Sequence, residues 1–213
     1  MNGTRGNGSP VLSLQFEVGQ GRNFAYLIGD PKSGKGALID PTADWPMLEE
    51  EGKQRGLVIE HVFNTHSHPD HTAGNAYFRG RGAKVVAHES APGQNDRPVK
   101  DGEVVPVGEV AVKVLHTPGH RFDSICLVAE GHLFTGDTLF IGECGRTDLL
   151  GSNPRQMHHT LLVILRGLQD DLLVMPGHNY GPVPSRTLGE EKRLNYTLQP
   201  RTLEEFLEFM AAP

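Results

Sequence analysis

Short apolar runs separated by polar segments rich in Gly and Pro recur along the whole chain. Some of them alternate apolar and polar positions, as residues 11–16 and 103–115 do, which predicts half-buried strands and, in the second case, a hairpin. Others are almost continuously apolar, as is typical of strands covered on both faces. The runs that predict strands lie at residues 11–16, 24–28, 37–40, 58–64, 83–88, 103–115, 124–129, 132–135 and 172–175.

Helix signals lie between these runs and after them. Asn153 is placed as an N-cap, with Pro154 at the first helical position. Thr187 and Glu190 match a capping box, which predicts a second helix start. The predicted helices lie at residues 47–55, 154–168, 187–196 and 202–212, a helix-compatible run begins at Thr72, and residues 90–102 are expected to be irregular.

This order of strands with interspersed helices predicts an α/β fold. The segment before the first strand, residues 1–10, is rich in Gly, Asn and Ser and is expected to be a flexible tail. No long linker interrupts residues 11–213, so the sequence predicts a single compact domain over that range.

Composition narrows the possible functions. The chain has 213 residues and a formal charge of −6, and it has no basic run, which argues against a nucleic-acid partner. The two cysteines, Cys126 and Cys144, give no disulfide framework. No apolar run approaches the roughly 20 residues of a membrane-spanning helix. Residues 1–10 lack the apolar core of a secretory signal, so we expect a cytoplasmic protein without a membrane partner.

The strongest chemical signal is the stretch Thr65-His66-Ser67-His68-Pro69-Asp70-His71, which follows an apolar strand. Its neutral nitrogen donors and its anionic oxygen suit a divalent cation. His66 and His68 alternate by two, so an extended backbone sends both rings to one face. Asp70 and His71 come where the chain must turn, so they can approach a second point from another angle.

Three later strand ends repeat this theme. His120, Asp137 and His178 each follow an apolar strand and a glycine that permits close backbone approach. Sites in α/β proteins are usually built at such strand ends. The sequence therefore predicts seven metal-binding side chains from four strand ends: His66, His68, Asp70, His71, His120, Asp137 and His178.

The order His-x-His-x-Asp-His, followed by single His, Asp and His residues, resembles the metallo-β-lactamase superfamily along nearly the whole chain. The resemblance implies a four-layer αββα sandwich with the metal site along one edge of two packed sheets. It implies a first metal site and a second metal site, with Asp137 bridging them. The first would comprise His66, His68 and His120, and the second Asp70, His71 and His178.

The chemistry expected of such a site is hydrolysis by a metal-bound hydroxide, with two zinc ions or a zinc–iron pair per chain. Asp70 and Asp137 are the expected catalytic carboxylates, Asp70 by steering the nucleophile. The sequence contains no Gly-x-Ser-x-Gly motif that would supply a serine nucleophile.

Within the superfamily, Cys144-Gly145-Arg146 and His178-Asn179-Tyr180 resemble glyoxalase II and the glutathione-dependent persulfide dioxygenases. The resemblance implies that Arg146 and Tyr180 contact a glutathione-type thiol or thioester. The leading hypothesis is therefore a thioesterase acting on hydroxyacyl-glutathione-type substrates. Loss of the second domain of glyoxalase II could also expose a surface that a second copy covers, which would make the protein a homo-oligomer.

Thr147 and Asp148 depart from the glyoxalase II pattern and resemble the dioxygenases instead. In that family His66, His120 and Asp137 would hold a single Fe(II), leaving open positions for oxygen and substrate. Persulfide oxidation is thus the alternative function. Hydrolysis of a lactone or a phosphoester is a weaker alternative, because the Cys-Gly-Arg and His-x-Tyr segments favour a thiol ligand.

Overall fold

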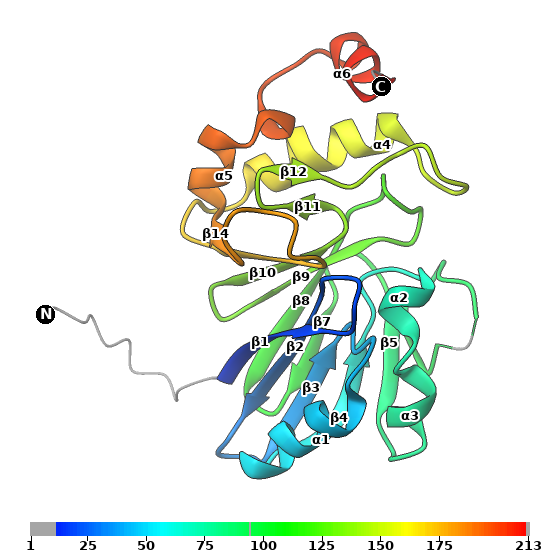
Figure 1. Cartoon of the computed structure of the whole chain (residues 1–213), viewed down its shortest axis with the longest axis vertical. Coiled ribbons are helices and arrows are strands. Elements are labelled where there is room, and N and C mark those ends of the chain that lie inside the picture. The colour runs from blue at the N-terminus through cyan, green and yellow to red at the C-terminus, as the bar shows by residue number, and fades with distance from the viewer. Residues whose placement is uncertain (1–11, 94, 212–213) are drawn as a thin grey trace, which may run out of the picture.

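The structure, a computed structural model, describes residues 12–93 and 95–211, and its centre is formed by two six-stranded sheets (Figure 1). The first sheet has the order β1 (Leu12–Val18), β2 (Asn23–Asp30), β3 (Lys35–Ile39), β4 (Val58–Phe63), β5 (Lys84–His88) and β6 (Arg97–Val99). The second has the order β14 (Arg186–Thr187), β13 (Leu173–Pro176), β10 (His132–Gly136), β9 (Ile125–Ala129), β8 (Val110–His116) and β7 (Val104–Val107). A small pair, β11 (Leu139–Phe140) and β12 (Glu143–Cys144), follows β10.

Helices cover the outer faces of both sheets, as Figure 1 shows. The first sheet is covered by α1 (Trp45–Gln54) and α3 (Asn75–Arg79), and the short α2 (Pro69–Thr72) lies near the junction of the sheets. The second sheet is covered by α4 (Pro154–His159) and α5 (Leu188–Leu194), and α6 (Leu203–Ala211) packs on α4. These layers form the metallo-β-lactamase sandwich of two sheets between helices that the sequence predicts.

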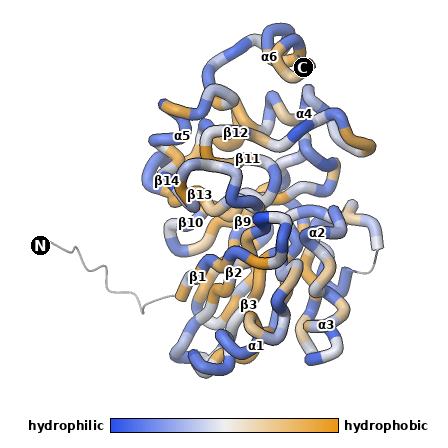
Figure 2. The backbone as a smooth tube through the Cα atoms, viewed as in Figure 1, coloured by the Kyte–Doolittle hydropathy of each residue, from blue (hydrophilic) through white to orange (hydrophobic). Residues whose placement is uncertain are grey.

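Three separate buried clusters, one for each interface between layers, explain why the sandwich has four layers. In β2 the side chains of Phe24, Tyr26 and Ile28 enter the cluster between the sheets, whereas Ala25 and Leu27 enter the cluster beneath α1 and α3. The whole strand is therefore buried, as its continuous apolar run predicts. A third cluster joins the second sheet to α4, α5 and α6. Figure 2 shows the apolar backbone segments concentrated along the strands.

Several sequence predictions of local structure need correction. A strand, β6, lies within residues 90–102, where irregular chain was expected, because three residues pair with β5 and bury only Val99. Helix α2 begins at Pro69 rather than near Thr72, since proline is well suited to the first helical turn. The helix expected over 154–168 is α-helical only to His159. It continues as a π-helical segment (Thr160–Ile164) and a 3-10 turn (Leu165–Gly167).

Other local predictions are confirmed. Asn153 caps α4 by accepting hydrogen bonds from the backbone of Arg155 and Gln156, and Thr187 and Glu190 form the capping box of α5. The hairpin predicted over residues 103–115 is β7–β8. The flexible tail predicted for residues 1–10 lies outside the described residues, and the single domain over 11–213 stays a prediction.

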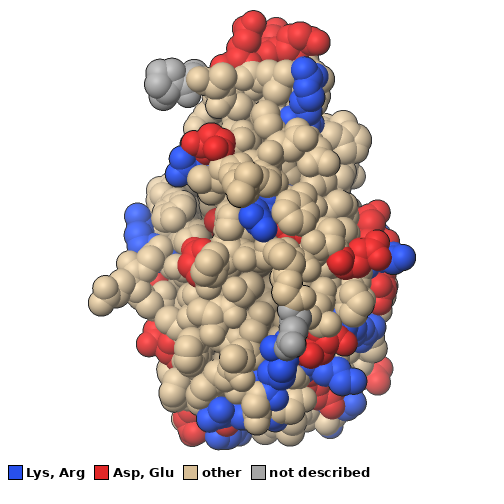
Figure 3. Space-filling model, turned by 90° about the vertical axis from the view of Figure 1, so that its right-hand side faces the viewer, with Lys and Arg blue, Asp and Glu red and all other residues tan. Residues whose placement is uncertain are grey.

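The described surface shows neither a membrane-spanning helix nor, on the face drawn in Figure 3, a continuous basic patch. Within residues 12–93 and 95–211, no helix is both long and apolar enough to cross a membrane. On the face that Figure 3 shows, Lys and Arg side chains lie among Asp and Glu side chains instead of forming a continuous basic surface.

Candidate metal centre

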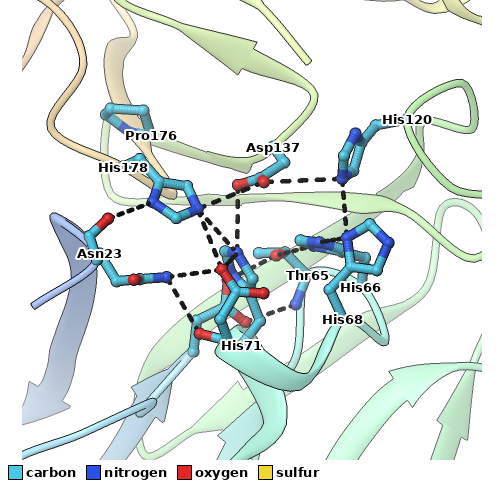
Figure 4. A network of polar contacts seen from close by, with 12 residues as sticks. Asn23, Thr65, His66, His68, His71, His120, Asp137, Pro176 and His178 are labelled. Atoms are coloured by element: carbon cyan, nitrogen blue, oxygen red, sulfur yellow. Dashed lines mark hydrogen bonds and ion pairs between the residues drawn. The ribbon is translucent and has the colours of Figure 1, made fainter. Parts of the chain in front are cut away.

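All seven predicted donors meet at one edge of the sandwich, where chain segments leave both sheets (Figure 4). From the first sheet, β4 ends at Phe63 and leads into His66 and His68, and α2 carries Asp70 and His71. From the second sheet, segments following three strands contribute the remaining donors. These are His120 beyond β8, Asp137 directly after β10 and His178 just after β13.

His66, His68 and His120, here called the first donor group, converge through their ring nitrogens. His66 Nε2 lies 2.9 Å from His68 Nδ1, which lies 3.0 Å from His120 Nε2. The alternation of His66 and His68 does send both rings to one point, although β4 itself has already ended. Three imidazole nitrogens facing one another can hold a single cation.

Asp70, His71 and His178, the second donor group, also lie within 4.8 Å of one another through their ligand atoms. His178 Nε2 is 3.4 Å from Asp70 Oδ2 and 3.3 Å from His71 Nε2. Asp137 lies between the groups, because its Oδ2 atom is 3.7 Å from His120 Nε2 and 3.4 Å from His178 Nε2. Its position suits a ligand shared by two ions.

Oxygen atoms outside the two groups fix the ring orientations. Arg146 O lies 3.0 Å from His120 Nδ1, and Gly21 O lies 3.2 Å from His178 Nδ1. A carbonyl can only accept, so each Nδ1 carries a proton and donates it, and in the neutral ring Nε2 is then the lone-pair donor that faces the site. The tautomer needed for metal binding is therefore set by the fold.

Asp40 is a site residue that the sequence analysis missed. Its carboxylate lies 2.9 Å from His71 Nδ1 and accepts hydrogen bonds from Thr65 N at 2.8 Å and Thr65 Oγ1 at 2.6 Å. It thus orients both His71 and the start of the histidine stretch. Asp40 directly follows the apolar strand β3, so the strand-end signal that revealed Asp137 could also have revealed it.

The two donor groups have opposite protonation preferences. Burial lowers the pKa of His66, His68 and His120, that of His66 well below its usual value. Burial also disfavours a charged His71, but the carboxylates of Asp137 and Asp40 outweigh it and hold its pKa well above the usual value. For His178, hydrogen bonds to Asp137 and Asp70 overcome the effect of burial and raise the pKa to about 9.

Asp137 is the clearest sign that the site suits a cation. Burial disfavours its charged form, yet the neighbouring His71 and His178 hold its pKa well below the usual range. Its Oδ1 atom is buried and accepts no hydrogen bond from the described residues. A buried anionic oxygen that accepts no hydrogen bond and lies 3.3 Å from His71 Nε2 fits zinc or iron as ligand chemistry.

Of the three glycines that precede His120, Asp137 and His178, two permit the close approach of chain segments at the donors that the sequence predicts. A Cβ at Gly177 would lie 2.4 Å from Asp137 Oδ1, and one at Gly136, whose φ is +49°, would lie 2.3 Å from Thr65 Oγ1. Gly119 serves a different contact, because its Cβ would lie 2.6 Å from Met157 Cα in α4. Glycine at these positions lets the strand ends and α4 pack around the donors.

A cavity of about 550 Å³ opens beside the donors and is lined by His120, Asp137, Phe140, Glu143, Cys144, Gly145, Arg146, Tyr180, Tyr196, Phe209 and Met210. Arg146 and Tyr180, the predicted substrate contacts, therefore both border it. Tyr180 stacks on His178 with ring centroids 4.7 Å apart and is 52% exposed. The guanidinium of Arg146 is already paired with Asp148, through contacts of 2.6 and 2.5 Å.

Neither cysteine is suited to act as a nucleophile. Both are buried, and burial raises the pKa of Cys126 and of Cys144 to about 12. A thiol of that pKa is almost wholly protonated near neutral pH, whereas nucleophilic attack needs the thiolate. The chemistry of the cavity therefore depends on the seven donors.

Comparison with known proteins identifies the family. The model of the metallo-beta-lactamase superfamily matches residues 18–94 and 89–178, and the chain belongs to this superfamily. The family binds divalent metals such as zinc or iron. One solved relative, TTHA1623 in a di-iron-bound form, is 27% identical with a TM-score of 0.73, over 86% of this chain and 98% of that one.

Its enzyme relatives fall into two classes. The mitochondrial persulfide dioxygenase ETHE1 of Homo sapiens is 32% identical over 96% of this chain and 82% of its own length. A hydroxyacylglutathione hydrolase of Polaromonas sp. is 41% identical over 75% of this chain, which spans 63% of that hydrolase. The crystal structure of ETHE1 from Myxococcus xanthus superposes with a TM-score of 0.89 at 33% identity, over 95% and 92% of the two chains. The protein is thus an enzyme of the branch that contains both activities.

Proposed function

We propose that the protein is a two-metal hydrolase that cleaves thioesters of the hydroxyacyl-glutathione type. The observation that carries the proposal is the presence of two complete donor groups joined by Asp137. Both donor groups are complete, and Asp40 and Gly21 orient the second, so a two-metal reaction would use the whole set. The hydrolase relatives, which match at up to 41% identity, support the same reading.

The protein's own residues would prepare the site for this reaction. Bound divalent ions would supply a coordinated water with a pKa near ~7 and polarise a carbonyl oxygen. Asp137 would be shared by both ions, because it lies between the donor groups. A hydrogen bond from Asn23 Nδ2 orients the half-exposed carboxylate of Asp70, which would accept a proton from an attacking water. Arg146 and Tyr180 would border the thiol part of the substrate.

One observation favours a second candidate, an iron-dependent persulfide dioxygenase. The alignment with human ETHE1 covers 96% of this chain, against 75% for the Polaromonas hydrolase. His66, His120 and Asp137 would then hold one Fe(II), as a two-histidine, one-carboxylate site with open positions. The remaining donors would be left without a metal.

One pair of measurements separates the candidates. The metal content of protein purified without added metal is determined, and oxygen uptake is recorded with glutathione persulfide. We expect about two metals per chain, no oxygen uptake, and hydrolysis of a glutathione thioester. About one iron per chain together with oxygen uptake would overturn the hydrolase proposal in favour of the dioxygenase.

A further inference from the structure

The turn between β1 and β2 is attached to the metal centre on both of its sides. Gly21 O accepts a hydrogen bond from His178 Nδ1 at 3.2 Å. The buried Asn23 donates through Nδ2 to Asp70 O at 3.1 Å and to Asp70 Oδ2 at 3.2 Å. Gly21 of the turn and Asn23, the first residue of β2, thus each contact a member of the second donor group, and Figure 4 shows Asn23 beside His178.

Arg22, between them, is held in place by its backbone. Its carbonyl accepts a hydrogen bond from Asn179 N at 2.7 Å. Its φ is +56°, a conformation that costs free energy for a residue with a Cβ and that persists only where the surroundings impose it. The turn therefore keeps one backbone conformation, and this conformation fixes the position from which the exposed side chain of Arg22 extends.

The side chain of Arg22 lies next to the cavity, beside Tyr180 of its lining. Its Cζ atom is 5.9 Å from the ring centroid of Tyr180, which lines the cavity and stacks on His178. Arg22 has no carboxylate partner among residues 12–93 and 95–211. The carboxylate of Glu17, in the preceding strand, instead accepts a hydrogen bond from Asn179 Nδ2 at 2.8 Å.

Arg146, the other cation at this cavity, makes an instructive contrast. Both of its outward-facing guanidinium contacts go to Asp148, so an incoming anion would first have to displace that carboxylate. Arg22 offers its fork of N–H donors without such competition, and a guanidinium binds a carboxylate through two parallel hydrogen bonds.

From this geometry we infer that Arg22 is a specificity residue that binds a free carboxylate of the substrate next to the cavity, beside Tyr180. The inference rests on the proposed function, because that function supplies a ligand with free carboxylates, a small thiol carrier. It adds a recognition element that belongs to the β1–β2 turn rather than to the Cys-Gly-Arg segment.

The test measures binding without turnover. Metal-loaded protein is titrated calorimetrically with S-hexylglutathione, which cannot be hydrolysed as a thioester, and with its diethyl ester, which lacks free carboxylates. The variants are Arg22→Gln, Arg22→Lys and Arg193→Gln, a matched loss of charge at an exposed residue of α5 that does not line the cavity. Because the turn is held by backbone atoms and by Asn23, all three are expected to keep the metal content of the wild type.

We expect Arg22→Gln to weaken binding of S-hexylglutathione about tenfold and binding of the diethyl ester hardly at all. Arg22→Lys should show a smaller loss, since it keeps the charge but not the two-pronged geometry, and Arg193→Gln should behave as the wild type. Equal affinities of the wild type and Arg22→Gln, or no binding of S-hexylglutathione by the wild type, would overturn the inference. A wild type that binds this ligand but hydrolyses no thioester would instead overturn only the proposed function.

Discussion

The two donor groups contain the same kind of side chain but differ in the charge around them. In the first group, His66, His68 and His120 face mostly one another, and burial keeps them neutral. In the second, His71 and His178 face carboxylates, which raise their pKa values despite burial. A ring surrounded by rings is ready to donate a lone pair, whereas a ring surrounded by carboxylates holds a proton until a cation replaces it. The surroundings, and not the residue type, thus decide the state of each histidine.

Removal of the carboxylate between the groups should have the largest effect. Asp137→Asn keeps the shape but removes the anionic oxygen that both groups approach, so thioester hydrolysis should fall by at least ~10³-fold. The metal content measured on the purified variant should fall with it. Near-normal activity of a correctly folded Asp137→Asn protein would show that the two groups do not share this residue.

Substitution of one ligand in each donor group tests whether both groups take part in hydrolysis. His120→Ala and His178→Ala should each lower hydrolysis by about 10²-fold or more and should each lower the metal content, because each removes a ligand from a different cation. Steady-state rates and metal analysis of the two variants are compared side by side. If His178→Ala kept full activity while His120→Ala lost it, the reaction would depend on the first group with Asp137 alone.

The role of Asp40 can be separated from the ligands themselves. Asp40→Asn weakens the partner of His71 Nδ1, so metal affinity should fall about 10- to 100-fold without loss of any ligand. Metal affinity is measured by competition with a chromophoric chelator. Asp171→Asn, which changes an exposed carboxylate in the turn before β13, serves as the matched control and should leave the affinity unchanged.

The smallest effect should appear in the metal-free protein, as a dependence of its stability on pH. The lowered pKa values of the first group stabilise the folded protein at a pH above about 6.5, the pKa of a histidine in the unfolded chain. This contribution is lost as the pH falls below that value. The raised pKa of His178 stabilises it at low pH, and this contribution is lost as the pH rises through about 9. Since the first contribution is lost below about pH 6.5 and the second between about pH 6.5 and pH 9, the Tm in chelator should be highest near pH 6.5 and fall by roughly 2–5 °C on each side.

A variant shows whether the alkaline arm of that profile belongs to the second group. His178→Gln should weaken the alkaline decline, to which His71 still contributes, and keep the decline in acid, because the first group remains. Thermal melts followed by circular dichroism across the pH range would measure both arms. A Tm of the parent protein that rises steadily to pH 10 would contradict the difference between the groups.

Much of the fold and of the site could be predicted because the signals are local. The strands of the sandwich appear as apolar runs, and each donor lies within or just after a run or a turn that the chain sequence itself marks. The elements that the sequence did not predict are short or depend on a neighbouring strand. Strand β6 exists because β5 offers it hydrogen bonds, and a three-residue segment carries too little pattern to predict it. The change from α- to π-helix at Thr160 also has no periodic signal.

The sequence by itself determined which residues are available as ligands, since their identity and order are written in the chain. Only the tertiary structure decided how they are oriented and charged, because the atoms that do this are distant in sequence. Asp40 reaches His71 across 31 positions, Asn23 reaches Asp70 across 47, and Gly21 reaches His178 across 157. Hydrogen-bond partners and local electric fields act over a few ångströms in space, so they exist only after folding has brought these segments together.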